Sequence, residues 1–105
     1  MEKHFLKKFI RTKKSSIVSR VECGKYRSYA ARFAAKEAMY KALSPYIKDE
    51  YKYTDYEVTN DEKGKPIAKF NGKLAEIEEI KNIRHHDLSL SHEGEYAIAT
   101  YVAEL

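Results

Sequence analysis

Four alanines spaced four residues apart constrain the fold of this chain more than any other feature. They are Ala30, Ala34, Ala38 and Ala42. On a helix, residues at this spacing form one ridge, and small side chains on that ridge allow another element to approach closely. We therefore expect a helix that begins after Gly24, ends near Leu43 before Pro45, and packs tightly against a partner element.

The second half of the chain predicts strands. Residues 55–70 (DYEVTNDEKGKPIAKF) alternate apolar and polar positions, which predicts a hairpin with its turn near Gly64. Residues 74–83 (LAEIEEIKNI) return to helical spacing. Residues 87–103 carry the clearest β signal, with leucines alternating with serines and a turn at 93–95.

The first segment is basic and amphipathic. Residues 4–14 (HFLKKFIRTKK) predict a short helix, and residues 15–25 (SSIVSRVECGK) predict a connection. The 105 residues contain no repeat, low-complexity tract or linker. The chain is therefore expected to form a single α+β domain over residues 1–105, in which an antiparallel sheet packs on a long helix.

Composition excludes several protein classes. Charged residues make up 34% and apolar residues 43%, a balance typical of a folded globular chain. No apolar run is long enough to span a bilayer, and no signal peptide is recognisable. The single cysteine, Cys23, has no partner for a disulfide or a zinc motif. We expect a cytoplasmic protein that does not bind a membrane.

Charge is distributed unevenly. Residues 1–44 carry twelve basic and three acidic side chains, whereas residues 45–105 carry eight basic and thirteen acidic ones, and the net charge is +4. The basic half would suit an acidic partner, such as nucleic acid, anionic lipid or an acidic protein. A solvated lysine-rich helix face would give the same composition.

Glu37 is placed where the apolar pattern of the helix should continue. It extends the ridge of Tyr29 and Phe33, and Lys41 follows one turn later. An ordinary surface Glu–Lys pair is the simplest explanation. The additional cations Arg32 and Lys36 would instead suit a metal–phosphate site, in which the carboxylate holds Mg²⁺ and the cations hold phosphate oxygens.

His92 shares strand parity with Leu88 and Leu90 and lies beside a turn. A histidine in such a position is more often structural than functional. A zinc site built from His85, His86 and His92 is disfavoured, because the chain has no matching thiol and no helical histidine spacing.

Three motifs in order, RFAAKEAMYKAL (32–43), NDEKGKP (60–66) and LSLSHEGEYAIA (88–99), resemble the phosphopantetheinyl transferases, specifically the small holo-acyl-carrier-protein synthase type. The resemblance covers residues 26–103. It implies transfer of phosphopantetheine from coenzyme A to a serine of apo acyl carrier protein, with Mg²⁺ as cofactor and adenosine bisphosphate as the second product.

The resemblance also implies site residues. Glu37 would bind the Mg²⁺ that bridges the pyrophosphate of coenzyme A, and Lys41 would lie near the phosphates or the attacking hydroxyl. His92 would line the cleft. The base that deprotonates the serine stays open among a metal-bound water, Glu37 and Lys41. The residues expected to contact coenzyme A are Arg32, Lys36, Gly64, Lys65, Pro66 and Ser91.

Partners follow from the same resemblance. Members of the type dock the acidic carrier protein on basic residues of their first helix and assemble as homotrimers with active sites between subunits. The docking candidates in this chain are Lys7, Lys8, Arg11, Lys13 and Lys14.

The chain departs from the family pattern at its start. Family members begin with a Gly-Ile-Asp strand whose aspartate is a second Mg²⁺ ligand, whereas this chain begins MEKHFLKKF, with Glu2 as its only acid there. We therefore expect the first strand to be missing and the sheet edge at residues 96–102 to be unpaired. Either an upstream segment supplies the strand, or Glu37, water and coenzyme A suffice, or the protein is a weak relative. In addition, His86 lies one position out of register with the family's histidine.

Two rival functions remain. A catalytically weak or inactive relative would bind coenzyme A or a carrier protein without transfer. A nucleic-acid-binding domain is suggested by the basic first half and nine tyrosines, but the tyrosines are scattered and the second half is acidic, so no nucleic-acid partner is expected.

Overall fold

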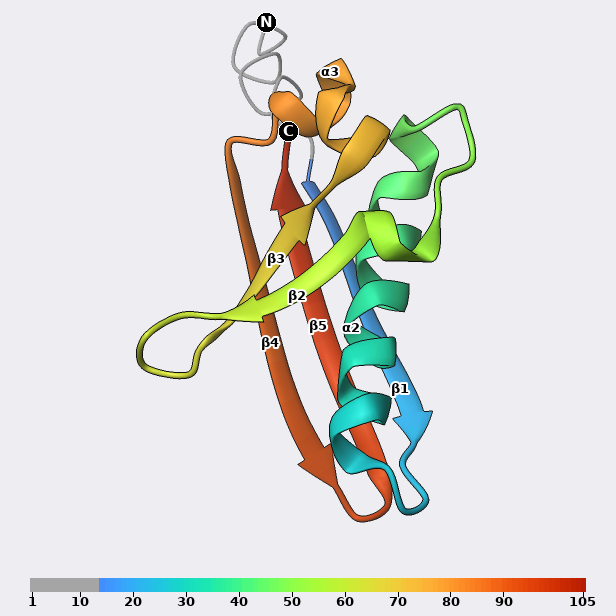
Figure 1. Cartoon of the computed structure of the whole chain (residues 1–105), viewed down its shortest axis with the longest axis vertical. Coiled ribbons are helices and arrows are strands. Elements are labelled where there is room, and N and C mark those ends of the chain that lie inside the picture. Colours follow the sequence, from blue (N-terminus) through green and yellow to red (C-terminus); the bar gives the residue numbers. More distant parts are fainter. Residues whose placement is uncertain (1–13) are drawn as a thin grey trace, which may run out of the picture.

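The computed structural model describes residues 14–105. In chain order, the main elements are β1 (Lys14–Glu22), α2 (Arg27–Leu43), β2 (Tyr56–Asn60), β3 (Pro66–Phe70), β4 (His85–Glu93) and β5 (Tyr96–Glu104). Short helical turns lie between them: η1 (Ser44–Tyr46), η2 (Tyr53–Asp55), η3 (Gly72–Glu76) and α3 (Glu78–Lys81). Figure 1 shows α2 lying along one face of a three-stranded sheet, with the β2–β3 hairpin crossing the same face.

The main sheet is antiparallel, with strand order β1-β5-β4. Along β5, alternate residues are completely buried under α2: Ala97, Ala99, Tyr101 and Ala103. The residues between them face the opposite side of the sheet and are only partly covered. The expected α+β class and the sheet packed on a long helix are confirmed.

The alanine ridge lies against this sheet. Ala34, Ala38 and Ala42 have no exposed surface, and Ala30 is 5% exposed. Because both contacting surfaces carry small side chains, the helix and the sheet approach closely. Helix α2 ends at Leu43, and Pro45 follows within η1, as the sequence predicts.

Strand β1 corrects two expectations. Residues 15–22 form a strand rather than a connection, and β1 pairs with β5 from Lys14–Glu104 to Glu22–Tyr96, so the sheet edge at 96–102 is not unpaired. Ile17 and Val21 pack against the core on one side of the strand. Serines on both faces of this half-buried strand obscured its apolar periodicity.

The second sheet is the expected hairpin of β2 and β3, in register from Tyr56–Phe70 to Asn60–Pro66. Gly64 adopts φ +85° at its turn, which glycine accommodates without strain. The Asp61 carboxylate accepts hydrogen bonds from the backbone N–H groups of Lys63 and Lys65 at the same turn. The hairpin prediction is confirmed.

The helix predicted at residues 74–83 is present only in short pieces. Residue Ile77 has an extended backbone (φ −77°, ψ 148°) between η3 and α3, so the helical run is broken there. Leu74 and Ile80 are buried, which explains why their spacing resembled one continuous helix.

The predicted basic helix at residues 4–14 lies outside the described residues except for Lys14, which is the exposed first residue of β1 and not helical. The docking candidates Lys7, Lys8, Arg11 and Lys13 therefore remain predictions. Of the helices between residues 14 and 105, none combines the length and apolar character that a membrane crossing needs.

Candidate functional site

Glu37 lies at the margin of the core, where α2 meets β1. The Ser19 hydroxyl donates a hydrogen bond of 2.9 Å to Oε1 of Glu37. Ser19 is 5% exposed and Glu37 is half-buried. The carboxylate is therefore held in a fixed orientation at the edge of the helix.

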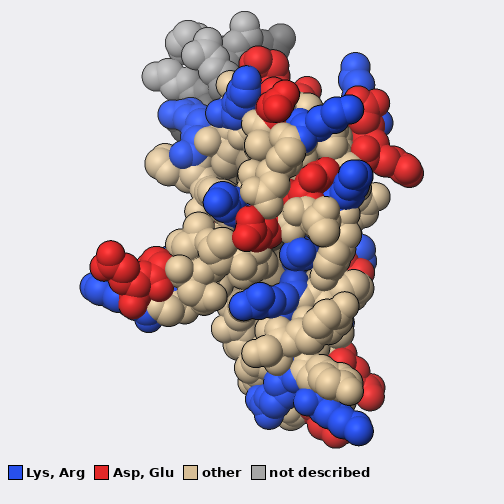
Figure 2. Space-filling model, in the orientation of Figure 1, with Lys and Arg blue, Asp and Glu red and all other residues tan. Residues whose placement is uncertain are grey.

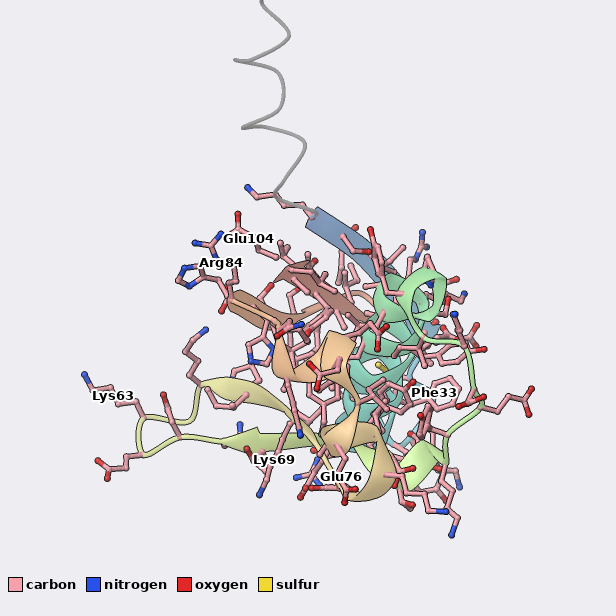
Figure 3. All side chains as sticks on the ribbon, turned by 90° about the horizontal axis from the view of Figure 1, so that it is seen from above. Phe33, Lys63, Lys69, Glu76, Arg84 and Glu104 are labelled. Carbon is pink, nitrogen blue, oxygen red and sulfur yellow. The ribbon has the colours of Figure 1, made fainter. Side chains whose placement is uncertain are left out.

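Lys36, the neighbouring residue on α2, is held by an aromatic ring. Its ammonium lies 4.1 Å from the centroid of the Tyr53 ring, within the range of a cation–π contact. Tyr53 belongs to η2 and also contacts Phe33, with 6.0 Å between ring centroids. Figure 3 shows Phe33 projecting from α2 on the side away from the main sheet.

A pocket of about 260 Å³ opens beside these residues. Apart from the charged pair Lys36 and Glu37, its lining is aromatic: Phe33, Tyr40, Tyr51, Tyr53 and Tyr56. Burial raises the pKa of Tyr56 to about 12, with smaller effects from neighbouring tyrosines and Asp55, and burial also raises the pKa of Tyr53. These phenols therefore stay neutral at physiological pH, and Glu37 supplies the negative charge of the pocket.

A second pocket of about 320 Å³ lies on the other side of Lys36 and Tyr53. It is lined by Tyr29, Arg32, Lys36, Tyr53, Glu57 and Val58. Together the two pockets contain two cations, Arg32 and Lys36 of α2, and two carboxylates, Glu37 of α2 and Glu57 of β2. Figure 2 shows basic side chains over the surface that α2 occupies in Figure 1. The two cations on α2 would attract anionic groups.

The other predicted catalytic residues, Lys41 and His92, line neither of these two pockets. Lys41 is exposed. His92 lies near the end of β4, where its Nδ1 atom is 3.9 Å from Sγ of the buried Cys23. Ser91 is exposed and alternates with His92 along the strand. A single copy of the described chain therefore does not bring His92 or Ser91 to Glu37.

The predicted nucleotide-bordering residues, Gly64, Lys65 and Pro66, lie at the hairpin turn. The Lys65 ammonium forms a 2.8 Å salt bridge with Asp87 on β4, and its hydrogen bond lowers the pKa of that carboxyl. Lys65 and Pro66 line a small pocket of about 160 Å³ that includes His86 and Asp87 but neither Glu37 nor Lys36. Gly64 is exposed at the turn outside that pocket.

Sequence reasoning missed Ser19 and Tyr53. Ser19 falls within the predicted connection, although it shares strand parity with Ile17 and Val21, and this alternation could have revealed its inward orientation. Tyr53 gave no such signal, because it is one of nine tyrosines and its contact with Lys36 depends on the path of the loop after α2.

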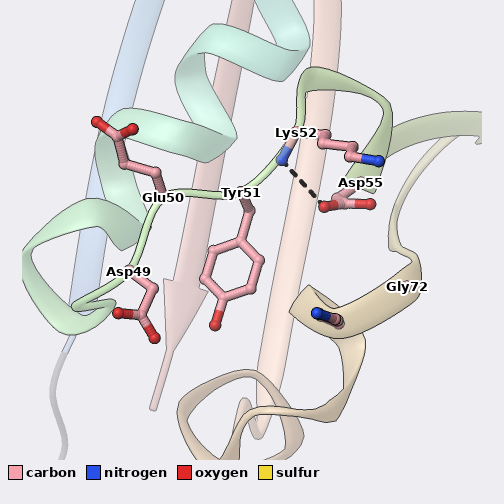
Figure 4. Close-up of a pocket in the computed structure, with 7 residues that line it drawn as sticks. Asp49, Glu50, Tyr51, Lys52, Asp55 and Gly72 are labelled. Atoms are coloured by element: carbon pink, nitrogen blue, oxygen red, sulfur yellow. Dashed lines mark hydrogen bonds between the residues drawn. The ribbon is translucent and has the colours of Figure 1, made fainter.

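A further cavity, of about 570 Å³, lies next to the aromatic pocket (Figure 4). It shares Tyr51 with that pocket, and its other lining residues are Asp49, Glu50, Lys52, Asp55, Gly72 and Lys73. The Asp55 carboxylate accepts a hydrogen bond of 3.0 Å from the backbone N–H of Lys52. This cavity has three carboxylates against two lysines, whereas the two pockets beside α2 have two carboxylates against two cations, so it is the poorer anion site.

Comparison with known proteins gives one consistent result. The family described as the 4′-phosphopantetheinyl transferase superfamily matches residues 2–101. A protein of Photobacterium profundum named holo-[acyl-carrier-protein] synthase is 44% identical over 80 residues, which are 76% of this chain and 64% of that protein. The chain thus spans less than two thirds of the length of the curated relatives it matches.

Solved structures show the same fold. The acyl carrier protein synthase of Mycobacterium tuberculosis has a TM-score of 0.69 and 26% identity, covering 85% of this chain and 95% of its own. A holo-(acyl-carrier-protein) synthase from Bacillus anthracis str. Ames, in complex with CoA, has a TM-score of 0.65 and 26% identity, covering 86% and 95%.

Proposed function

The chain belongs to the 4′-phosphopantetheinyl transferase superfamily, and from that premise we propose that it transfers phosphopantetheine from coenzyme A to a serine of apo acyl carrier protein. The products are holo carrier protein and adenosine bisphosphate. One observation carries the proposal: Glu37 and Lys36 stand side by side in an aromatic-lined pocket, with Arg32 in the adjoining pocket.

The arrangement suits attack on a pyrophosphate. The serine hydroxyl must reach a phosphorus atom surrounded by negative oxygens, so catalysis depends mainly on positioning and charge neutralisation. Arg32 and Lys36 would hold phosphate oxygens, and the aromatic walls would exclude water from one side of the pocket. In the reaction, a bond forms between the serine oxygen and phosphorus while the bond to the adenosine bisphosphate oxygen breaks.

Mg²⁺ fits this site on the condition that phosphate and water supply most of its ligands. The region from residue 14 to residue 105 contains no group of three or more His, Cys, Asp and Glu side chains arranged to hold a metal. Mg²⁺ commonly uses only one or two carboxylates and takes its other ligands from phosphate and water. Glu37 would hold it, with the Ser19 hydroxyl alongside. When bound, the metal would neutralise charge on the pyrophosphate oxygens.

We further propose that the protein works as a homotrimer and docks its carrier protein through basic side chains. The separation of His92 from Glu37 within one chain is consistent with sites shared between subunits. The face of the main sheet opposite α2 supports assembly as well, because Val18 is 64% exposed there and lies in the strand next to β5.

A second candidate function rests on a different observation. Glu37 faces a serine of β1 instead of a second carboxylate. This favours a relative that binds coenzyme A or a carrier protein with weak or no transfer. The two candidates differ in one measurable property, the rate of transfer at saturating coenzyme A.

The experiment that tests the transferase proposal is a mass spectrum of apo acyl carrier protein after incubation with this chain, coenzyme A and Mg²⁺. We expect a phosphopantetheine mass gain that falls on the order of 100-fold or more in rate with Glu37→Gln. Glu62→Gln at the hairpin turn is the matched control and should retain the rate. Binding of coenzyme A without any mass gain would support the second candidate.

A further inference from the structure

The contact between Lys36 and Tyr53 joins two parts of the chain that are separate in sequence. Lys36 lies in the middle of α2, whereas Tyr53 lies in η2, beyond the loop that follows the helix. The ammonium is 4.1 Å from the ring centroid. Lys36 is half-buried, although Tyr53 is 47% exposed. The ring therefore covers the ammonium end of a lysine that projects from the helix surface.

These two residues form the boundary between the two pockets beside α2. Among residues 14–105, only Lys36 and Tyr53 line both of them. Glu37 lies on one side of the boundary and Arg32 on the other. A ligand that runs from the carboxylate to the guanidinium must therefore pass the Lys36 ammonium.

An aromatic partner holds a lysine differently from a carboxylate. The four-carbon stem of lysine is flexible, and acidic groups flank it in both pockets, namely Glu37 and Glu57. An ion pair with either would neutralise the ammonium and occupy its N–H donors. The ring face attracts the cation through its quadrupole without cancelling the charge, so N–H donors remain available to phosphate oxygens.

We propose that Tyr53 is a positioning residue that holds the Lys36 ammonium at this boundary, ready to bind the phosphates of coenzyme A. The inference rests on the proposed function, because the phosphates come from that substrate. Tyr53 acts through Lys36 and contributes a ring face; its hydroxyl is not required.

A measurement without ligand tests the contact itself. In the full chain, the ε-methylene signals of Lys36 should show an upfield ring-current shift in ¹H–¹³C NMR spectra. The shift should persist in Tyr53→Phe and disappear in Tyr53→Leu. Tyr26→Leu is the matched control, since Tyr26 is 68% exposed and lines neither pocket. An unshifted Lys36 signal in the native protein would overturn the proposal.

Calorimetric titration with coenzyme A tests whether Tyr53 positions Lys36 for phosphate binding. Tyr53→Leu should weaken binding about two- to fivefold, the range expected for an exposed cation–π contact, whereas Tyr53→Phe should bind normally. In a Lys36→Met background, Tyr53→Leu should cause no further loss, because its effect passes through the ammonium. If Tyr53→Leu weakened coenzyme A binding by the same factor with and without Lys36→Met, the positioning role would be contradicted.

The failure of this inference is distinguishable from failure of the proposed function. If the native chain binds no coenzyme A, the proposed function and the inference fall together. The native chain could instead bind coenzyme A and transfer phosphopantetheine while Tyr53→Leu and Lys36→Met weaken binding independently. In that case only the proposed role of Tyr53 is contradicted. Melting temperatures of all variants, measured in parallel, separate a loss of packing against Phe33 from a loss of phosphate affinity.

Discussion

The Nδ1 atom of His86 lies 3.0 Å from the phenolic oxygen of Tyr101. The His86 ring also stacks on Phe70 at 6.1 Å with an interplanar angle of 20°. His86 thus connects the β2–β3 hairpin to the centre of the main sheet, where Tyr101 is completely buried. This contact makes the docking of the hairpin sensitive to protonation of one imidazole.

The first prediction concerns acid stability. Burial lowers the pKa of His86 more than the nearby Asp87 raises it. The unfolded chain therefore binds a proton more readily than the folded chain does, so stability is complete above about pH 6.5 and falls as the pH drops below that value. Urea unfolding between pH 5 and pH 8 should show this loss, and His86→Gln should flatten it.

His85→Gln is the control for that experiment, since His85 is the adjacent residue on β4 and its side chain lies on the opposite face of the sheet. It should leave the pH profile unchanged. A profile that is identical for the native chain and His86→Gln would contradict the assignment.

The second prediction concerns Ser19. In Ser19→Asp, a second carboxylate would lie next to Glu37, so repulsion between the two charges should lower the melting temperature without divalent cations. Mg²⁺ should restore it, because two carboxylates hold the ion better than one. Thermal unfolding with and without Mg²⁺ measures this directly.

Ser19→Ala is the matched variant. It removes the hydrogen bond to Glu37 and should cost about 1 kcal/mol without any new response to Mg²⁺. Equal Mg²⁺ responses in the Asp and Ala variants would show that Ser19 and Glu37 do not share an ion-binding position.

The third prediction tests the close approach of helix and sheet. Ala38 has no exposed surface, so Ala38→Leu should destabilise the fold by about 1–3 kcal/mol through overpacking. Ser28→Leu, at an exposed position of the same helix, should have little effect. Urea midpoints compare the two, and equal midpoints would show that the ridge tolerates a larger side chain.

The fourth prediction tests assembly through the open sheet face. Val18→Asp should convert the proposed trimer to smaller species in sedimentation velocity, because it places a charge on that face. Ile67→Asp, at a 37% exposed position on the hairpin, should leave the mass unchanged. A native chain that sediments as a monomer would refute the trimer outright.

Sequence reasoning recovered the elements with strong periodicity. The alanine ridge identified α2 and its buried face, and alternation identified β2–β3 and β4–β5. Strand β1 was missed because serines occupy positions on both of its faces. Its sequence therefore does not alternate between apolar and polar residues, although its burial does alternate. The break at Ile77 was missed because the apolar spacing continues through it.

The candidate site was predictable only in part. The sequence motif placed Arg32, Lys36 and Glu37 together, since neighbouring helix positions have fixed relative directions. The groups that hold them, the Ser19 hydroxyl and the Tyr53 ring, come from other elements. Their positions depend on strand pairing and on the loop path after α2, which local patterns do not encode.

The turn of the β2–β3 hairpin projects from the body of the protein, with Lys63 at its outer end (Figures 1 and 3). Residues inserted between Glu62 and Lys63 would extend this arm without entering the core. Each doubling of the loop length would cost only about 0.6 kcal/mol in closure entropy. The arm is therefore a natural place to attach a fluorescent reporter that leaves the packing of α2 on the main sheet undisturbed.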